Sequence, residues 1–256
     1  MNRRLFLKIF LLGATVARYR AFAGTPVLLA AASDLRFALP PILEEFHEKS
    51  GIRIEATYGA SGNLAQQILQ GAPFEIFMSA DEEYVHFLAQ EGMTIGEGKY
   101  YALGRLALLL GDGVHFSLDE KLAGIRSAME KGMLRHFAIA NPATAPYGRA
   151  ARETLMHLDL WAKIEPLLVY GENAAQAMQF ISSGSVEAGL VPLSLVKALG
   201  FKEKDKFILM PGSLHKALRQ KMVLTRRASE EAQSFYRYFL HPDILSKLKE
   251  YGFDAS

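Results

Sequence analysis

Hydrophobic and polar positions along the chain follow two alternating patterns, one typical of buried strands and one of helices. Residues 27–32 form a short apolar run, which predicts a buried first strand. Apolar residues then recur at helical spacing from Leu35 to Phe46, and Gly51 marks the end of that segment. Because Pro40 and Pro41 interrupt the pattern, we expect a bend or a separate first turn there.

The next segment predicts a strand that turns sharply into a helix. Residues 52–57 alternate apolar and polar side chains in the period of a strand, and Gly59 permits a tight turn. Ser61 is predicted to be the N-cap of the helix that follows. Its hydroxyl and the N–H groups of Gly62 and Asn63 then form a cluster of donors at the positive end of a helix. Such a cluster binds an anion without a cation, whereas the plainer interpretation is that Ser61 only caps a helix.

Strands and helices alternate over the rest of the chain, which is the pattern of an α/β protein with sheets covered by helices. The predicted strands cover residues 75–78, 103–110, 136–140, 167–170, 188–191 and 218–225. One predicted helix follows the capping-box spacing of Ser79 and Glu82, and the others cover residues 119–131, 146–157, 174–183, 229–240 and 242–252. No linker or repeat divides the chain, so we predict two lobes joined by crossing strands. Lobe 1 is predicted to contain residues 24–103 and 214–256, and lobe 2 residues 104–213.

The first 23 residues differ in composition from the rest of the chain. Arg3 and Arg4 begin a basic segment, residues 5–17 are mostly apolar, and residues 21–23 place two alanines around a phenylalanine. This order is typical of a secretory signal that is cleaved before Gly24. The arginine pair leaves both a Sec and a twin-arginine export route open. The apolar run is too short and too interrupted by charges for a membrane anchor.

Charge and cysteine content narrow the class of protein. The 256-residue chain has a formal net charge of +2, but removal of the predicted signal leaves 24 basic and 27 acidic residues. No basic run interleaved with aromatic residues is present, so we expect no nucleic-acid partner. The chain contains no cysteine, which excludes disulfides and a lipid-bearing cysteine after the signal. We therefore expect a soluble periplasmic protein.

Four predicted strand-to-helix corners share a chemistry. They contain Ser33-Asp34, Ser61-Gly62-Asn63, residues 145–148 and residues 171–174. Corners that follow parallel strands lie on one edge of a sheet, where ligands of open α/β folds bind. Two corners come from each half of the chain, and facing each other they would surround a compact oxyanion with uncharged donors. A carboxylate at Asp34 would repel an anion unless it turned away, so only its backbone is given a role.

These corners resemble those of the periplasmic molybdate-binding proteins of ABC transporters. The resemblance runs in order over nearly the whole mature chain and includes residues 31–35, 58–63, 71–73, 78–81, 141–142, 145–148, 170–173 and 189–194. It implies a type II periplasmic-binding-protein fold, with two α/β lobes of mostly parallel sheets joined by two crossover strands. The two lobes are expected to close over tetrahedral molybdate or tungstate.

The resemblance also implies a set of ligand-binding residues. Ser33 and Ser61 correspond to contacts made through hydroxyl and backbone groups, and Tyr147 and Ala174 to contacts made through backbone N–H groups. All four are expected to contact the oxygens of the oxyanion, with no direct ligation of the metal and no cofactor. Some family members add a tyrosine hydroxyl where this chain has Pro192. That fifth contact is absent here, or is supplied by the Tyr147 phenol or by water.

The implied function is capture of molybdate or tungstate and its delivery to the permease of an ABC transporter in the inner membrane. The protein is expected to be a monomer and not an enzyme. Anion binding would tether the two lobes and shift an open–closed equilibrium toward the closed form. Cavity size would discriminate against sulfate, and a shortage of acceptors against protonated phosphate.

An exported serine hydrolase that uses Ser61 is the main alternative. Residues 59–63 lie on a predicted strand-to-helix turn, as a nucleophile elbow does, but Asn63 stands where the elbow has glycine. Asp159 and His215 or His241 would have to complete the triad.

A second alternative, the effector domain of a transcription regulator, is disfavoured by the predicted export signal and by the lack of an N-terminal DNA-binding segment.

Two arginines near the third corner allow two interpretations. Arg149 and Arg152 either add positive potential near the cleft, or cover a helix face and pair with Glu153 or other acids.

Overall fold

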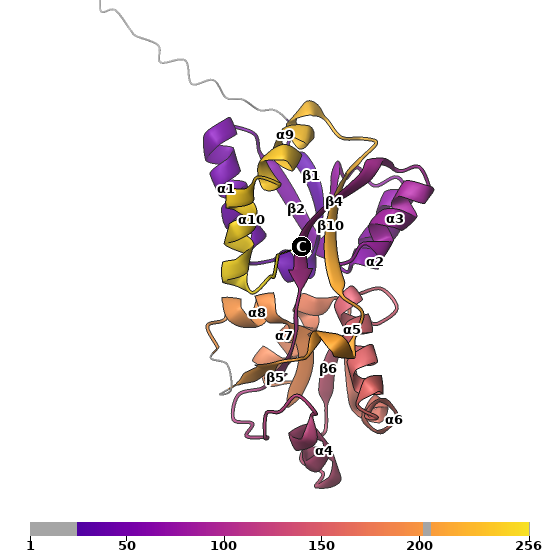
Figure 1. Ribbon diagram of the computed structural model, residues 1–256, viewed down its shortest axis with the longest axis vertical. Helices are drawn as coiled ribbons and strands as arrows, with labels where there is room; N and C mark the ends of the chain where they lie inside the picture. Colours follow the sequence, from indigo (N-terminus) through magenta and orange to yellow (C-terminus); the bar gives the residue numbers. More distant parts are fainter. Residues whose placement is uncertain (1–24, 202–205, 256) are drawn as a thin grey trace, which may run out of the picture.

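The computed structural model describes residues 25–201 and 206–255 and consists of two α/β lobes stacked along the long axis (Figure 1). Each lobe is built on a five-stranded sheet. We call lobe 1 the part that packs on the sheet with strand order β2-β1-β3-β10-β4, and lobe 2 the part that packs on the sheet with order β7-β6-β8-β5-β9. The predicted export signal, residues 1–23, lies outside the described residues.

Both sheets are mixed: three neighbouring strands pair in parallel, a fourth runs antiparallel to them, and the fifth pairs with that strand and runs in the direction of the first three. The strands of lobe 1 are β1 (Val27–Ala32), β2 (Ile54–Gly59), β3 (Ile76–Ser79), β4 (Thr94–Gly104) and β10 (Leu218–Thr225). Those of lobe 2 are β5 (Leu106–Leu110), β6 (Phe137–Ala140), β7 (Leu168–Gly171), β8 (Ala188–Pro192) and β9 (Phe207–Leu209). The parallel strands are β1, β2 and β3 in lobe 1 and β6, β7 and β8 in lobe 2, so each lobe has one edge where their carboxyl ends meet.

Helices cover both faces of each sheet. Lobe 1 contains the 3-10 turn η1 (Ser33–Leu35), α1 (Leu39–Ser50), α2 (Ser61–Leu69), α3 (Glu83–Gln90), α9 (Glu230–Phe239), α10 (Pro242–Leu248) and the 3-10 turn η4 (Lys249–Tyr251). Lobe 2 contains α4 (Ala123–Glu130), α5 (Pro146–His157), α6 (Trp161–Ile164), η2 (Glu165–Leu167), α7 (Ala174–Ser182) and α8 (Leu193–Ala198). The turn η3 (Gly212–Leu214) lies between β9 and β10.

The alternation of side chains along β1 explains how lobe 1 is layered. Leu29 and Ala31 face one side of the sheet and pack in the cluster that includes Phe46 of α1 and Phe235 of α9. Ala30 faces the other side and packs with the apolar residues of α2 and α3. Figure 1 shows the same arrangement, with α1, α9 and α10 on one side of the strands and α2 and α3 on the other.

The chain passes from lobe 1 to lobe 2 within the apolar segment at residues 103–110. A single strand was the prediction there, and it is wrong: β4 ends at Gly104 in one sheet, and β5 begins at Leu106 in the other. Both strand ends are buried, so the hydrophobic run is continuous although the sheet changes. The break is braced from the C-terminal end of the chain, where Asp254 exchanges two backbone hydrogen bonds of 2.9 Å with Leu103 and pairs with Arg105 at 2.5 Å.

The return from lobe 2 to lobe 1 uses the segment between β9 and β10. Its residues 210–217 contain η3, and β10 then pairs with β4 so that Leu218 lies opposite Gly104. The outgoing and the returning connection therefore lie side by side where they meet lobe 1. The chain division predicted at residues 103–104 and 213–214 stays a prediction. The first position lies at the end of β4 and the second in η3.

Several predicted helix starts differ from the structure because another side chain satisfies the first turn. The helix predicted from Asp119 begins at Ala123, since the Asp119 carboxylate accepts the N–H groups of Ala123 and Gly124 at 3.0 and 3.1 Å. The capping box predicted at residues 79–82 is wrong: α3 begins at Glu83, and Asp81 accepts the N–H of Tyr84 at 3.3 Å. By contrast, the separate turn expected before Pro40 is confirmed, because η1 precedes α1.

Candidate functional site

One cavity between the lobes is lined by residues of all four corners. The lining residues are Ala32, Ser33, Asp34, Gly59, Ala60, Ser61, Ala80, Ala145, Pro146, Tyr147 and Ala174. The four residues singled out in the sequence, Ser33, Ser61, Tyr147 and Ala174, are all among them. The cavity has a volume of only ≈ 10 Å³, close to the space that one water molecule needs. A ligand of this site must therefore be compact, and the lobes must separate to admit it.

Ser61 lies in the cavity wall at the start of α2 and is 1% exposed. The prediction that it is the N-cap is wrong, because Ala60 is the N-cap residue and Ser61 the first helical residue. Its hydroxyl oxygen instead accepts the backbone N–H of Ala80, at 3.0 Å, from the neighbouring corner after β3. An oxygen held in this way leaves its own proton available for an acceptor in the cavity.

Ser33 occupies the equivalent place at the end of β1 and connects the lobes. Its hydroxyl oxygen accepts the N–H of Ala175, in the first turn of α7, at 3.3 Å. That N–H is shared with the side chain of Asn173, which caps α7 by accepting from Ala175 at 3.0 Å and from Gln176 at 3.1 Å. The Ser33 hydroxyl proton is thus not needed for this contact and, as at Ser61, can be donated elsewhere.

Tyr147 and Ala174 supply backbone groups from the first turns of α5 and α7. N–H groups in the first turn of a helix have no partner within the helix, and they carry its positive dipole end. Pro146 has no N–H, so the first donor of α5 is that of Tyr147. The corner needs glycine at residue 148, because a Cβ there would lie 2.2 Å from the carbonyl oxygen of Ala140.

Asp34 also lines the cavity, and its carboxyl group is 1% exposed. The side-chain amide of Gln220, on β10, donates to its Oδ2, while Oδ1 has no hydrogen-bond partner among the described residues. Burial raises the pKa of this carboxyl from 3.8 to about 6, although hydrogen bonds from Gln220 and Tyr147 oppose the shift. From the sequence, only the backbone of this residue was expected to have a role in the site.

The Tyr147 phenol is buried and directed toward the first crossover. It accepts from the side-chain amide of Gln220 at 3.4 Å, and a Cβ on Gly104 would lie 2.3 Å from its oxygen. Pro192 ends β8 opposite Leu106 and does not line the cavity. Whether a fifth ligand contact is absent, or is made by the Tyr147 phenol or by water, stays at the level of prediction.

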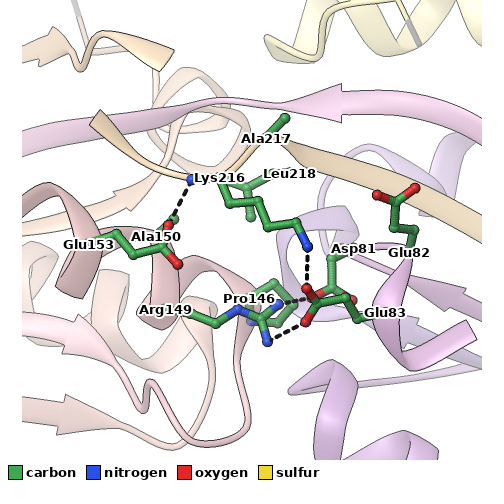
Figure 2. Close-up of a pocket in the computed structure, with 10 residues that line it drawn as sticks. All are labelled: Asp81, Glu82, Glu83, Pro146, Arg149, Ala150, Glu153, Lys216, Ala217 and Leu218. Carbon is green, nitrogen blue, oxygen red and sulfur yellow. Dashed lines mark hydrogen bonds and ion pairs between the residues drawn. The ribbon is translucent and has the colours of Figure 1, made fainter. Parts of the chain in front are cut away.

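A network of charged side chains joins the lobes beside the cavity (Figure 2). Arg149, on α5, pairs with Asp81 and, at 3.0 Å, with Glu83 of lobe 1. Lys216, in the second crossover, pairs with Glu83, and its N–H donates to the Glu153 carboxylate at 2.7 Å. We call these five residues the interlobe ion cluster. Because its basic groups already face carboxylates, the cluster is poorly suited to hold a further anion.

The ion cluster was not predicted. Arg149 was expected to add positive potential near the cleft or to pair with acids such as Glu153, and it does pair with acids, but with those of lobe 1. Arg152 lies 5.3 Å from the ring centroid of Trp161 within lobe 2. One signal was present in the sequence, since Arg149 lies in the first turns of a helix, where a positive charge is unfavourable without a nearby acid.

Two direct contacts bring the lobes still closer. The N–H of Gly62 donates to the carbonyl oxygen of Thr144 at 2.8 Å, and the phenol of Tyr84 donates to that of Ala143 at 3.5 Å. The described lobes are therefore in a closed arrangement around the cavity.

The lining of the cavity does not supply the histidine that a serine nucleophile of the predicted triad needs. No histidine is among its lining residues, and the three residues named for a triad have other surroundings. Asp159 follows α5, the ring of His215 contacts the carbonyl of Lys216 at 2.8 Å, and His241 caps α10. Among residues 25–201 and 206–255, no three His, Asp or Glu side chains are grouped for a metal ion. In the same part of the chain, every helix is too short or too polar to cross a membrane.

Comparison with known proteins covers both lobes. Residues 27–254 match the family model of the bacterial extracellular solute-binding proteins. The molybdate-binding protein ModA of Rhodobacter capsulatus is 33% identical over 234 residues, which cover 90% of this chain and 89% of that protein. ModA of Azotobacter vinelandii is 32% identical over 236 residues, or 91% of each.

The solved structures include a close match of fold. The periplasmic molybdate-binding protein of Azotobacter vinelandii has a TM-score of 0.81 and 26% sequence identity, over 90% of this chain and 99% of that one. The predicted two-lobed α/β fold is therefore confirmed.

Proposed function

The chain belongs to the family of bacterial extracellular solute-binding proteins, and from this premise we propose that it is the periplasmic component of an ABC transporter that captures molybdate or tungstate. Relatives that match both lobes carry molybdate binding in their names. The proposal rests on the small cavity between the lobes, whose wall contains Ser33, Ser61, Tyr147 and Ala174. Because these relatives are binding proteins, the proposed role is non-enzymatic and requires no cofactor.

Neutral donors hold the anion in this proposal. The hydroxyls of Ser33 and Ser61 donate from lobe 1, and the N–H groups of Tyr147 and Ala174 donate from lobe 2 at the positive ends of two helices. These residues contact the oxygens and do not ligate the metal directly. Since donors of both lobes reach the anion only in the closed form, binding shifts the open–closed equilibrium toward closure.

Selectivity follows from the size and chemistry of the same wall. A fixed set of donors fits one bond length best, so the cavity discriminates molybdate and tungstate from the smaller sulfate. Hydrogen phosphate carries a proton that needs an acceptor, whereas the four contacts proposed here act as donors to the anion.

The closed form is the species that the membrane permease recognises in this mechanism. The protein acts in the periplasm as a monomer, without a nucleic-acid partner, after export through the predicted signal. The periplasmic relative of known structure supports this location.

Isothermal titration of residues 24–256 with molybdate, tungstate, sulfate and phosphate at matched ionic strength tests the function. We expect tight one-to-one binding of molybdate and tungstate, no heat from sulfate or phosphate, and weaker binding after Ser61→Ala. No binding of any of the four anions would contradict the proposal, and reaction of Ser61 with a serine-hydrolase probe would then be the next measurement.

A further inference from the structure

The Asp34 carboxyl is the one acidic side chain in the wall of the proposed oxyanion cavity. It belongs to the residue next to Ser33 in sequence, which is 1% exposed. Its Oδ2 accepts the side-chain amide of Gln220, and its Oδ1 is buried without a hydrogen-bond partner among the described residues. A buried carboxylate oxygen without a donor is costly, whereas a protonated oxygen at the same place is itself a donor.

The groups around this carboxyl compensate a negative charge only in part: burial raises its pKa more than hydrogen bonds from Gln220, Tyr147 and the backbone lower it. The titratable groups that face it are the phenols of Tyr147 on α5 and Tyr101 on β4, and burial raises the pKa of both well above the ordinary value, so both are neutral. Gln220 on β10 is an uncharged amide that also accepts from the Tyr101 phenol at 2.7 Å.

The other elements that pack on η1 are β2, α7 and α8. On β2, Glu55 is exposed and pairs with Arg53, and burial raises the pKa of the Tyr58 phenol, so that it is neutral. From α8, Ser194 donates to the Asp34 backbone carbonyl at 2.9 Å, and α7 contains no charged residue. The nearest charged residues in sequence on these elements, Arg36 after η1 and Lys197 on α8, line other pockets on the surface.

An oxyanion in this cavity would lie beside the carboxyl in a region from which water is largely excluded. Two negative charges a few ångströms apart repel each other by several kcal/mol even at an effective dielectric constant of about 20. No described cation stands between them to reduce this repulsion. Protonation of the carboxyl removes the repulsion and converts an acceptor into a donor. Asp34 then acts on the anion as a donor, like the side chains and N–H groups of the other proposed contacts.

We propose that Asp34 takes up one proton from solvent when the oxyanion binds, so that it determines specificity as a neutral hydrogen-bond donor of the cavity. The inference rests on the proposed function. The proton is bound at Oδ1, because Oδ2 already accepts from Gln220. No bond of the oxyanion is formed or broken, and the proton returns to solvent when the anion leaves.

The proton also explains which anions suit the cavity. A protonated Asp34 has a hydrogen to donate and fits an oxyanion without hydrogens, such as molybdate or tungstate. An ionised Asp34 would be an acceptor and would favour an anion that keeps its own proton, such as hydrogen phosphate.

The raised pKa of the free carboxyl, about 6, sets the expected pH range. Below this value Asp34 is already protonated and molybdate binding takes up little proton. Above it the proton must be acquired on binding, so the dissociation constant for molybdate should rise about tenfold per pH unit. Between pH 6 and pH 8 the rise should approach about 50-fold, because half of the carboxyl is already ionised at pH 6.

Titration calorimetry with molybdate in pairs of buffers that differ in ionisation enthalpy measures the protons taken up. We expect close to one proton per molybdate at pH 7.5 to 8 and a decreasing number toward pH 6, as approximate values from the same linkage. The Asp34→Asn variant keeps a neutral amide of the same shape. It should take up no proton, bind with a pH-independent dissociation constant and, at pH 8, bind molybdate more tightly than the unmodified protein. Glu130→Gln, an exposed change on α4, should leave the pH profile unaltered.

One result would overturn the inference and leave the proposed function standing: molybdate binding by the unmodified protein without proton uptake across this range. The proton count on the unmodified protein does not depend on whether the variant folds. Absence of molybdate binding at every pH would instead refute the proposed function, and the inference with it.

Discussion

The backbone N–H of Gly62 in lobe 1 donates to the carbonyl oxygen of Thr144 in lobe 2 at 2.8 Å. A Cβ at residue 62 would lie 2.8 Å from that same oxygen and 2.7 Å from the phenol oxygen of Tyr84. Real side chains do not tolerate such distances to a backbone oxygen. Closure of the two lobes therefore depends on the absence of a side chain at this position.

Replacement of this glycine should separate folding from closure. In Gly62→Ala the methyl group meets the backbone of the opposite lobe, so we expect the dissociation constant for molybdate to rise at least about tenfold, or about 1.4 kcal/mol. The melting temperature of the ligand-free protein should change little, because alanine is favourable in a helix. Calorimetry and small-angle scattering with and without molybdate measure the two effects. Gly212→Ala, where no atom lies within 4 Å of the added Cβ, is the control, and equal affinities for the two variants would contradict the prediction.

The interlobe ion cluster should contribute to the stability of the closed form. Arg149→Gln leaves the carboxylate of Asp81, whose side chain is 6% exposed, without its cation in the closed form only. The affinity for molybdate should fall about tenfold at low salt, and the difference from the unmodified protein should shrink as salt screens the charges. Calorimetry over a series of salt concentrations provides the measurement.

Arg152→Gln is the matched control for the ion cluster. This arginine lies on the same helix but packs on Trp161 within lobe 2, so its removal should not alter affinity. A similar loss in both variants would show that helical charge, and not contact between the lobes, controls binding.

Loss of the Ser33 hydroxyl should weaken binding more than its hydrogen bond to the anion alone implies. Hydrogen bonds to charged groups contribute about 1.5–3 kcal/mol, so Ser33→Ala should raise the dissociation constant for molybdate by at least about tenfold. It also removes the acceptor that Ala175 of lobe 2 uses at 3.3 Å. Calorimetry compares this variant with Ser182→Ala, an exposed change on α7 that should have no effect; unchanged affinity in Ser33→Ala would remove Ser33 from the ligand set.

Asp34 should also affect the stability of the ligand-free protein. Its folded-state pKa of about 6 is higher than the ordinary 3.8, so the folded state binds the proton more tightly than the unfolded state. Stability is therefore lost as pH rises from about 4 to about 6, by at most about 3 kcal/mol, and does not return at higher pH. Urea unfolding at pH 4 to 8 should show Asp34→Asn gaining stability relative to the unmodified protein over that range. A difference that is constant with pH would contradict the raised pKa.

The elements predicted most accurately from the sequence have local signals at their ends. The helix predicted at residues 146–157 is α5, which begins with Pro146 at its first position, and the strand predicted at residues 218–225 is β10. The four proposed site residues also share one cavity, because residues that follow parallel strands are brought to a common edge.

The features that were missed depend on contacts between distant parts of the chain. The hydroxyl of Ser61 contacts the corner after β3 and not its own helix, which no local capping rule specifies. The contact between Asp34 and Gln220 joins residues 186 positions apart, and that between Arg149 and Asp81 joins residues 68 apart. The change of sheet near Arg105 was not recognised from hydropathy, because the end of β4 and all of β5 are buried and apolar.

The position of lobe 2 in the chain has a consequence for how such proteins diversify. Lobe 2 is one continuous insertion whose two ends meet where Gly104 lies opposite Leu218 in the sheet of lobe 1. A single genetic exchange of residues 105–217 between relatives would replace the Tyr147 and Ala174 corners together, and it would leave Ser33 and Ser61 in their original scaffold. Two of the four proposed anion contacts, those of Tyr147 and Ala174, can thus be exchanged together in one step. New oxyanion preferences can therefore arise by recombination as well as by point mutation.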